Sequence, residues 1–176
     1  MHSYTYRQKS GQGCLAACLA YLYGIKPDSS YEHYMVRAGL FGFRDNFAIN
    51  MTIAFLARYR QAGKGLRLGF AHKRYAKLLQ SKISRSGMVI EPCNTQVWLQ
   101  GKMSYPFVLY VDRYALGAEY HYPHFILVLT ATEKMLMIYD PWEGKCRRIQ
   151  RTKITKAVQL LRAHLRVCSV VISVVH

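Results

Sequence analysis

Three short apolar runs in the second half of the chain constrain its fold most. Residues 106–111 (PFVLYV), 125–130 (FILVLT) and 134–139 (KMLMIY) are rich in β-branched and aromatic residues, which is typical of buried strands. The connection between the last two runs is only three residues long, so they are expected to form a hairpin. We expect further strands at 88–92, 146–150 and 167–175.

The first half of the chain has helical periodicity instead. In residues 13–23, Leu15, Cys18, Leu19 and Leu22 follow the spacing of a helix face, and Gly24 stands where a helix commonly ends. The other expected helices are 31–38, 47–59, 72–82 and 154–164, and we expect the glycine-rich segment 63–69 to interrupt the chain. Helices followed by mostly antiparallel strands predict an α+β fold. We expect one domain, 1–176, with a helical lobe at about 1–101 and a sheet lobe at about 102–176.

Length and charge exclude several classes of protein. The 176 residues suit one domain, and no apolar run approaches the ~18 residues of a membrane span. The N-terminus lacks the apolar core of a signal peptide, so we expect synthesis in the cytoplasm. The formal charge is +16, and the stretches 46–90 and 144–176 contain no acidic residue. Such a surface attracts nucleic acid, acidic protein or anionic lipid, although a solvated basic face without a partner is an equal alternative.

The five cysteines do not form a recognisable framework. Their number is odd and no CxxC motif occurs, which disfavours a disulfide scaffold or a zinc ribbon. Cys14 and Cys18 would share a helix face, but His121 and His124 would point to opposite sides of a strand. We therefore expect neither a metal nor a cofactor.

Cys14 is the first candidate catalytic residue. It lies in the first turn of the expected helix, behind Gly11 and Gly13. The positive end of the helix dipole and the free backbone N–H groups there favour the thiolate, which is the nucleophilic form. The alternative interpretation is a small buried helix residue, and this is the interpretation we give Cys18.

His124 and Asp140 are the candidate base and its orienting group. His124 opens the FILVLT strand, and Asp140 directly follows KMLMIY. The end of the second strand of a hairpin lies near the start of the first, so Asp140 is expected beside His124. A carboxylate there would fix the tautomer of the imidazole. A strand-edge histidine and an Asp-Pro turn are the structural alternatives, and His121 competes with His124.

Gln8 is the candidate oxyanion donor. It precedes Cys14 by six residues, and a primary amide can donate a hydrogen bond to the oxyanion of a tetrahedral intermediate. Gln12 is closer in sequence and remains an alternative.

Two segments of the chain resemble the C39 family of papain-like cysteine peptidases. QKSGQGCLAACLAYLYG resembles the family's opening, a Gln six residues before the catalytic Cys and a helix of the form Cys-x-x-Ala-Cys-Leu-Ala. HFILVLTATEKMLMIYDPWEG resembles its second block, a His, a strand, then Asp-Pro and a glycine. The matching positions are Gln8, Cys14, Ala17, Cys18, Leu19, Ala20, Tyr23, Gly24, His124, Asp140, Pro141 and Gly144. The chain departs at Gly13 and Leu15, where the family usually has an acidic residue and a glycine.

The resemblance implies a papain-like fold, a Cys14–His124–Asp140 triad and Gln8 at the oxyanion. It implies a double-glycine peptidase that cleaves a protein or leader peptide after a Gly-Gly pair. Members of this family are usually fused to exporters, but because this sequence has no membrane span we expect a stand-alone peptidase. Related stand-alone papain-like domains also serve as bacterial effector toxins, which are delivered into another cell and inhibited by an immunity protein. An effector activity is therefore a second expected role, and the basic surface would suit an acidic inhibitor.

Two other functions remain open from the sequence. One is a papain-like acyl- or peptidyl-transferase with the same triad. The other is a catalytically inactive basic module that binds nucleic acid, which the intact set of site residues disfavours.

Overall fold

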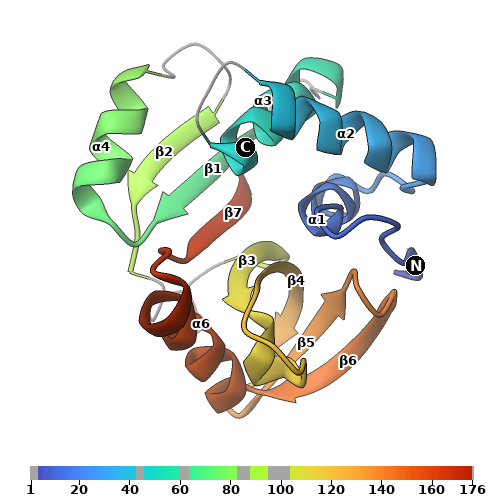
Figure 1. The fold of residues 1–176 in the computed structure, drawn as a ribbon, viewed down its shortest axis with the longest axis vertical. Coiled ribbons are helices and arrows are strands. Elements are labelled where there is room, and N and C mark those ends of the chain that lie inside the picture. The colour runs from blue at the N-terminus through green and yellow to red at the C-terminus, as the bar shows by residue number, and fades with distance from the viewer. Residues whose placement is uncertain (1–3, 43–45, 60–63, 83–87, 95–103, 176) are drawn as a thin grey trace.

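The computed structural model describes residues 4–42, 46–59, 64–82, 88–94 and 104–175. The helices are α1 (Cys14–Leu22), α2 (Ser29–Phe41), α3 (Phe47–Tyr59), α4 (Lys73–Lys82) and α6 (Arg151–Leu165), with a short 3-10 helix η1 (Arg113–Leu116). The strands are β1 (Gly65–Phe70), β2 (Met88–Pro92), β3 (Phe107–Asp112), β4 (Pro123–Ala131), β5 (Met135–Asp140), β6 (Lys145–Gln150) and β7 (Val170–Val175). Figure 1 shows their arrangement. No helix within these ranges is both long and apolar enough to cross a membrane.

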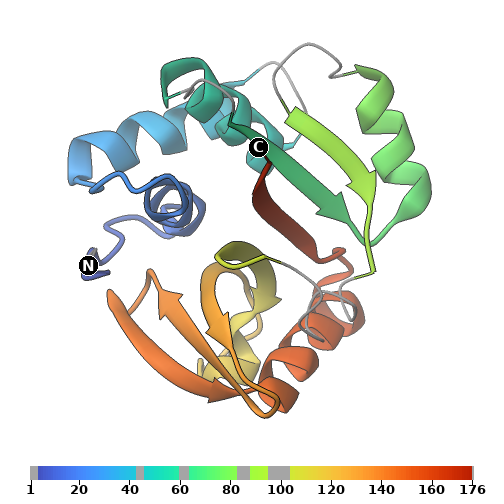
Figure 2. The same cartoon turned by 180° about the vertical axis from the view of Figure 1, so that it is seen from behind.

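The strands form one seven-stranded sheet in the order β2-β1-β7-β3-β4-β5-β6. Its neighbouring strands are antiparallel except β1 and β2, which are parallel and joined through α4. Parallel neighbours require such a crossover connection. The C-terminal strand β7 lies between β1 and β3, so it joins the strands of the first half of the chain to those of the second (Figures 1 and 2).

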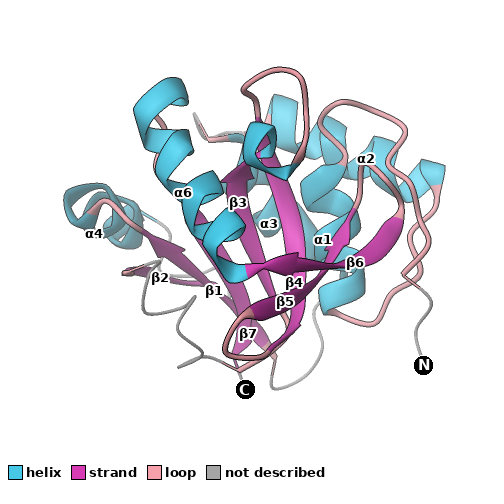
Figure 3. Ribbon diagram, turned by 90° about the horizontal axis from the view of Figure 1, so that it is seen from below, coloured by secondary structure: helices cyan, strands magenta, loops and turns pink. Residues whose placement is uncertain are grey.

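The alternation of side chains along each strand builds two cores, one on each face of the sheet. In β4, Phe125 and Leu127 belong to the core that contains α1, whereas Ile126 and Val128 belong to the core that contains buried residues of α6. Figure 3 shows α6 on one side of the sheet and α1, α2 and α3 on the other. All nine residues of α1 are buried, as expected for a helix that is apolar on every side.

The predicted α+β class is confirmed, with helices first and mostly antiparallel strands after them. The expected interruption at 63–69 is wrong from residue 65 onward, because β1 runs from Gly65 to Phe70. Leu66, Leu68 and Phe70 alternate into the core, and β1 is paired on both sides. These cross-strand contacts outweigh the low strand propensity of glycine. Residue 63 lies outside the described residues.

Candidate active site

Cys14 is the first residue of α1, and Gly13 caps this helix without a side-chain hydrogen bond. The backbone N–H groups of the first turn therefore point out of the helix beside the thiol. The helix packs against β3 and β4, and the Cys14 side chain is 6% exposed. The thiol thus lies at the positive end of a buried helix, against the sheet that carries His124.

His124 lies near the start of β4 and is 1% exposed. Its Nε2 atom is 2.8 Å from Oδ1 of the buried Asp140, the last residue of β5. The β4–β5 register pairs Leu127 with Tyr139, which places Asp140 diagonally across from His124 on the same face. Nε2–H donates to the carboxylate, so Nδ1 is the ring nitrogen that is left to face Cys14. A hydrogen bond between His124 and Cys14 is one of the interactions that raise the pKa of the imidazole.

The pKa of His124 is raised to about 9. Burial alone would lower it, but hydrogen bonds with Asp140 and Cys14 and the negative charge of both groups outweigh burial. The pKa of Asp140 is lowered in turn: burial would raise it, but the hydrogen bond and charge of His124, the charge of Arg113 and the backbone N–H of Trp142 outweigh burial. The imidazolium is therefore the stable form of His124 at neutral pH.

Two arginines act on the carboxylate of Asp140. Arg147 of β6 places Nη2 3.3 Å from Oδ2 of Asp140. The charge of Arg113, which stacks over the ring of Trp142 at 4.9 Å from the centroid, helps to lower the pKa of Asp140.

The turn between β5 and β6 begins directly after Asp140. It is closed by a hydrogen bond of 2.8 Å from the N–H of Gly144 to the carbonyl of Asp140. Gly144 has φ +67°, and a Cβ there would lie 2.8 Å from Cβ of Arg7, so this turn requires glycine.

Gln8 and Gln12 differ in their placement. The Gln8 side chain is 7% exposed, and its backbone N–H donates to the carbonyl of Pro141 over 2.9 Å. Its Nε2 donates to the carbonyl of Ser10 over 2.6 Å. Gln12 is exposed. The structure thus ties Gln8, and not Gln12, to the turn that follows Asp140.

A buried carboxylate, that of Glu32 in α2, holds the loop that leads into Cys14. It accepts hydrogen bonds from the N–H groups of Lys9 and Ser10, from the Ser10 hydroxyl and from the Tyr6 hydroxyl, all between 2.7 and 3.0 Å. A Cβ at Gly13 would lie 2.2 Å from Oε1 of Glu32. A side chain at position 13 would therefore displace the Glu32 carboxylate, which lies on another helix, from its hydrogen bonds.

No protein-family model matches the sequence, and no curated protein is similar to it at a significant level. Among solved structures, the chain is similar to the peptidase domain of Streptococcus ComA, a bifunctional ABC transporter involved in a quorum-sensing pathway. The TM-score is 0.57 at 15% identity, and the match covers 99% of this chain and 98% of that domain. The chain has the papain-like α+β fold of this peptidase domain. The resemblance that the two sequence segments suggested is thus supported by a structural match over nearly the full length.

The other histidine candidate, His121, has a different environment in this fold. His121 has its Nδ1 2.7 Å from Oδ2 of the buried Asp112, and its ring stacks on His164 of α6 with centroids 4.1 Å apart. His121 thus has its own carboxylate partner, whereas the pKa of His124 responds to Cys14.

An aromatic pocket of about 520 Å³ has in its wall Phe125, the residue that follows His124 in β4. Its walls include Phe47, Phe70, Tyr75, Tyr110 and Phe125. Tyr110 stacks on Phe125 with ring centroids 4.3 Å apart, and its pKa is raised to about 12 by burial and, less, by the charge of Cys14. The sequence does not reveal this pocket, because its walls come from α3, β1, α4, β3, β4 and β7 and no local pattern links them.

Glu32 and Arg147 are two further site residues that we did not predict from the sequence. Nothing in the sequence distinguishes Glu32 from an exposed helix acid. Arg147 had a signal in the short segment between Asp140 and the expected strand 146–150, which suggests a hairpin. In the structure this hairpin pairs Asp140 with Lys145 and Ile138 with Arg147, so Arg147 lies diagonally across from Asp140.

Replacing Cys14 should lower the pKa of His124. Two of the contributions that raise it, the hydrogen bond and the charge of Cys14, disappear in Cys14→Ala, whereas Asp140 remains. We expect titration of the His124 ring, followed by NMR with labelled histidine, to shift to lower pH. Cys18→Ala is the matched control one helical turn away, and it should leave the titration unchanged.

The raised pKa also fixes the sign of the pH dependence of stability. His124 binds its proton more tightly in the folded state, so its stabilising contribution is complete below about pH 6.5 and is lost as pH rises through about 9. The difference in unfolding free energy between wild type and His124→Gln should shrink over that range in urea titrations. A constant difference would contradict a charged imidazole.

Replacing Glu32 by alanine should destabilise the fold by about 2–4 kcal/mol, because it removes the acceptor of hydrogen bonds from Tyr6, Lys9 and Ser10. Glu32→Gln keeps an acceptor oxygen and should lower the free energy of unfolding by less.

Gly13→Ala should also destabilise the fold. The double variant Gly13→Ala, Glu32→Ala should lose less stability than the sum of the two single variants, because the new methyl group clashes with the Glu32 carboxylate. Additive losses in urea unfolding would refute this packing.

Proposed function

We propose that this chain is a cysteine peptidase that hydrolyses a peptide bond through Cys14, His124 and Asp140. The observation that carries the proposal is the position of Cys14 at the N-terminus of α1 beside the buried His124–Asp140 pair. The C39 fold supports it, since the similar ComA domain is a peptidase domain.

The thiolate of Cys14 attacks the carbonyl carbon of the scissile bond and forms a tetrahedral intermediate. The negative oxygen accepts hydrogen bonds from the Cys14 backbone N–H and from the Gln8 amide, which has a second N–H besides the one that donates to Ser10. His124 then donates its Nδ1 proton to the leaving amine as the C–N bond breaks, and a thioester remains. A water molecule gives its proton to His124 and attacks the thioester, which releases the acid and restores Cys14.

Asp140 acts on His124 and not on the substrate. Its carboxylate accepts the Nε2–H of the ring, so that Nδ1 faces the thiol, and its charge stabilises the imidazolium. Arg147 and the N–H of Trp142 hold the carboxylate in turn.

The substrate is a peptide or protein, cleaved after a Gly-Gly pair as the sequence resemblance implies. Leader processing and an effector activity in another cell would use the same chemistry. The aromatic pocket beside Tyr110 is the subsite in which a bulky apolar side chain of the substrate would be buried.

Iodoacetamide labelling at about pH 6, followed by peptide mass spectrometry, tests the activated thiol. An ordinary cysteine, with a pKa near ~8.5, reacts very slowly there. Cys14 should label fastest of the five cysteines, and His124→Ala should slow it at least about tenfold. If Cys14 labels no faster than the exposed Cys146, the site is not an assembled nucleophile and the proposal fails.

A further inference from the structure

The aromatic pocket next to His124 in β4 adjoins a second pocket of about 550 Å³. The two pockets share His72 and Cys168 in their walls. Together they form one groove, which we call the α4–α6 groove because its outer half lies between the start of α4 and the second half of α6. The groove runs from Tyr110, which stacks on Phe125 beside His124, to Lys73 and Arg162.

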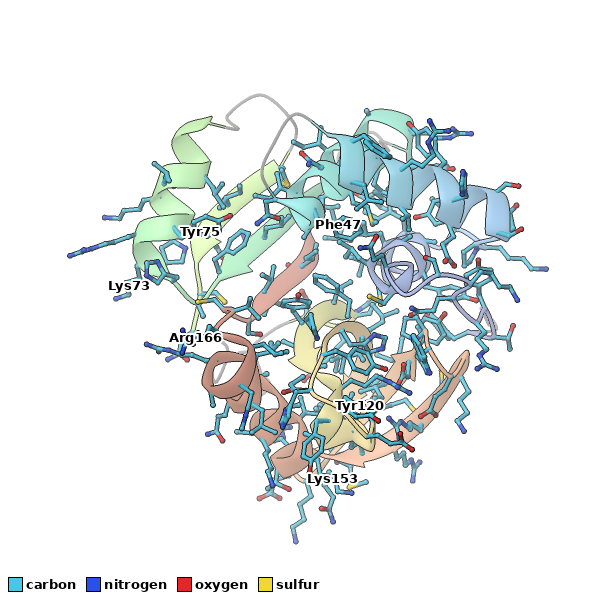
Figure 4. The ribbon with its side chains drawn as sticks, in the orientation of Figure 1. Phe47, Lys73, Tyr75, Tyr120, Lys153 and Arg166 are labelled. Carbon is cyan, nitrogen blue, oxygen red and sulfur yellow. The ribbon has the colours of Figure 1, made fainter. Side chains whose placement is uncertain are left out.

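The walls of the outer half are basic. They come mainly from the stretches 46–90 and 144–176, neither of which contains an acidic residue. Lys73 and Arg162 are exposed, and within the described part of the chain neither forms an ion pair. In Figure 4, Lys73 and Arg166 lie on the side of the molecule where α4 approaches the end of α6, whereas Lys153 lies at the other end of α6.

Hydrogen-bond donors add to these charges at the point where the two pockets meet. Nδ1 of His72 accepts the N–H of Tyr75 over 3.1 Å, so the neutral ring carries its proton on Nε2. The N-terminus of α4, a helix of 10 residues, lies at Lys73, and its dipole has its positive end there. The groove thus combines an apolar inner half with an outer half that favours anions.

We propose that the α4–α6 groove binds an acidic segment of the peptide substrate, with a bulky apolar side chain in the aromatic pocket and one or more carboxylates at Lys73 and Arg162. The inference rests on the proposed peptidase function and names the substrate class. A peptide is favoured over nucleic acid because the inner half of the groove is apolar and has Phe125, the neighbour of His124, in its wall. A substrate chain held across Cys14 can extend directly into it.

Binding to the inactive Cys14→Ala variant tests the groove without turnover. The probe is a fluorescein-labelled peptide with a Gly-Gly pair and a phenylalanine flanked on both sides by glutamates. In fluorescence anisotropy, it should bind at least about tenfold more tightly than the same peptide with glutamines. Replacing its phenylalanine by alanine should also weaken binding about tenfold, because the aromatic pocket then loses its apolar occupant.

Lys73→Glu combined with Arg162→Glu, in the Cys14→Ala background, should abolish the preference for glutamate. Glutamate at the first position of α4 suits the helix dipole, and circular dichroism checks that the variant folds. The matched control is Arg148→Glu combined with Lys153→Glu. It makes the same change of charge at a different pocket and should retain the preference.

Three results would overturn the groove proposal. They are equal loss in both double variants, equal binding of the glutamate and glutamine peptides, and tighter binding of a single-stranded DNA oligonucleotide that displaces the peptide. These outcomes are separate from the labelling test. Fast labelling of Cys14 with equal binding of the two peptides would support the peptidase proposal and contradict the groove proposal. Slow labelling with glutamate-specific binding would contradict the peptidase proposal and show that the groove binds acidic peptides without it.

Discussion

Replacing Cys14 by alanine should abolish peptide cleavage, with a loss of at least about 10⁴-fold, while the protein remains folded. The thiol forms the only covalent bond between enzyme and substrate in the proposed mechanism, and alanine offers no substitute. A proteome-derived peptide library incubated with each variant, and read by mass spectrometry for new termini, measures the loss. Reaction in ¹⁸O-labelled water adds a second readout, because a hydrolase incorporates the label and a transferase forms a new amide or thioester.

Cys18→Ala is the matched control for this result. Cys18 lies one helical turn further along α1, is fully buried, and its Sγ donates to the carbonyl of Phe125 over 3.7 Å. Its loss should cost about 1–2 kcal/mol of stability and leave cleavage intact below the melting temperature. New termini that persist in Cys14→Ala would refute the mechanism.

Replacing Asp140 by alanine should have the second-largest effect. The change leaves His124 buried without its carboxylate and removes one of the partners of Arg147, which keeps the carbonyl of Leu116 and the carboxylate of Glu143. Breaking a buried pair of this kind costs about 3–5 kcal/mol of stability. Cleavage should fall by about 10²–10⁴-fold, because the ring loses both its orientation and the charge that stabilises the imidazolium. The pKa of His124 should fall as well, since Asp140 is one of the groups that raise it.

Asp112→Ala separates the catalytic part of this effect from the structural part. Asp112 is as buried as Asp140 and makes its own contact with a histidine, His121. The two alanine variants should therefore lose similar stability, but only Asp140→Ala should lose cleavage when both are assayed folded. Equal activity in the two variants would show that Asp140 supports the fold alone.

Asp140→Asn should reduce cleavage less than Asp140→Ala, since an amide oxygen can still accept the Nε2–H of His124.

The lowered pKa of Asp140 also predicts a pH dependence of stability. The contribution of this carboxylate to stability is present above about pH 4 and is lost as pH falls further. Acid unfolding of Asp140→Asn should lack this component, and urea titrations between about pH 3 and pH 6 measure it.

The sequence alone determined the parts of the protein that depend on short-range order. The periodicity of residues 13–23 predicted α1, and α1 begins at Cys14. The His124–Asp140 contact followed from one hairpin, because two strands joined by a short turn fix which residues lie across from one another. The α+β class followed from the order of helical and strand-like segments.

The tertiary structure alone decided the features built from distant segments. Glu32 of α2 reaches the loop before Cys14 across more than twenty residues, and only this contact explains the glycine at position 13. Strand β1 forms because β2 and β7 pair with it, although its glycines suggested a break. The two acid-free stretches were visible in the sequence, but their meeting in the α4–α6 groove depends on the insertion of β7 between β1 and β3. Such long-range pairings leave no local periodicity, since they are selected by burial in the completed sheet.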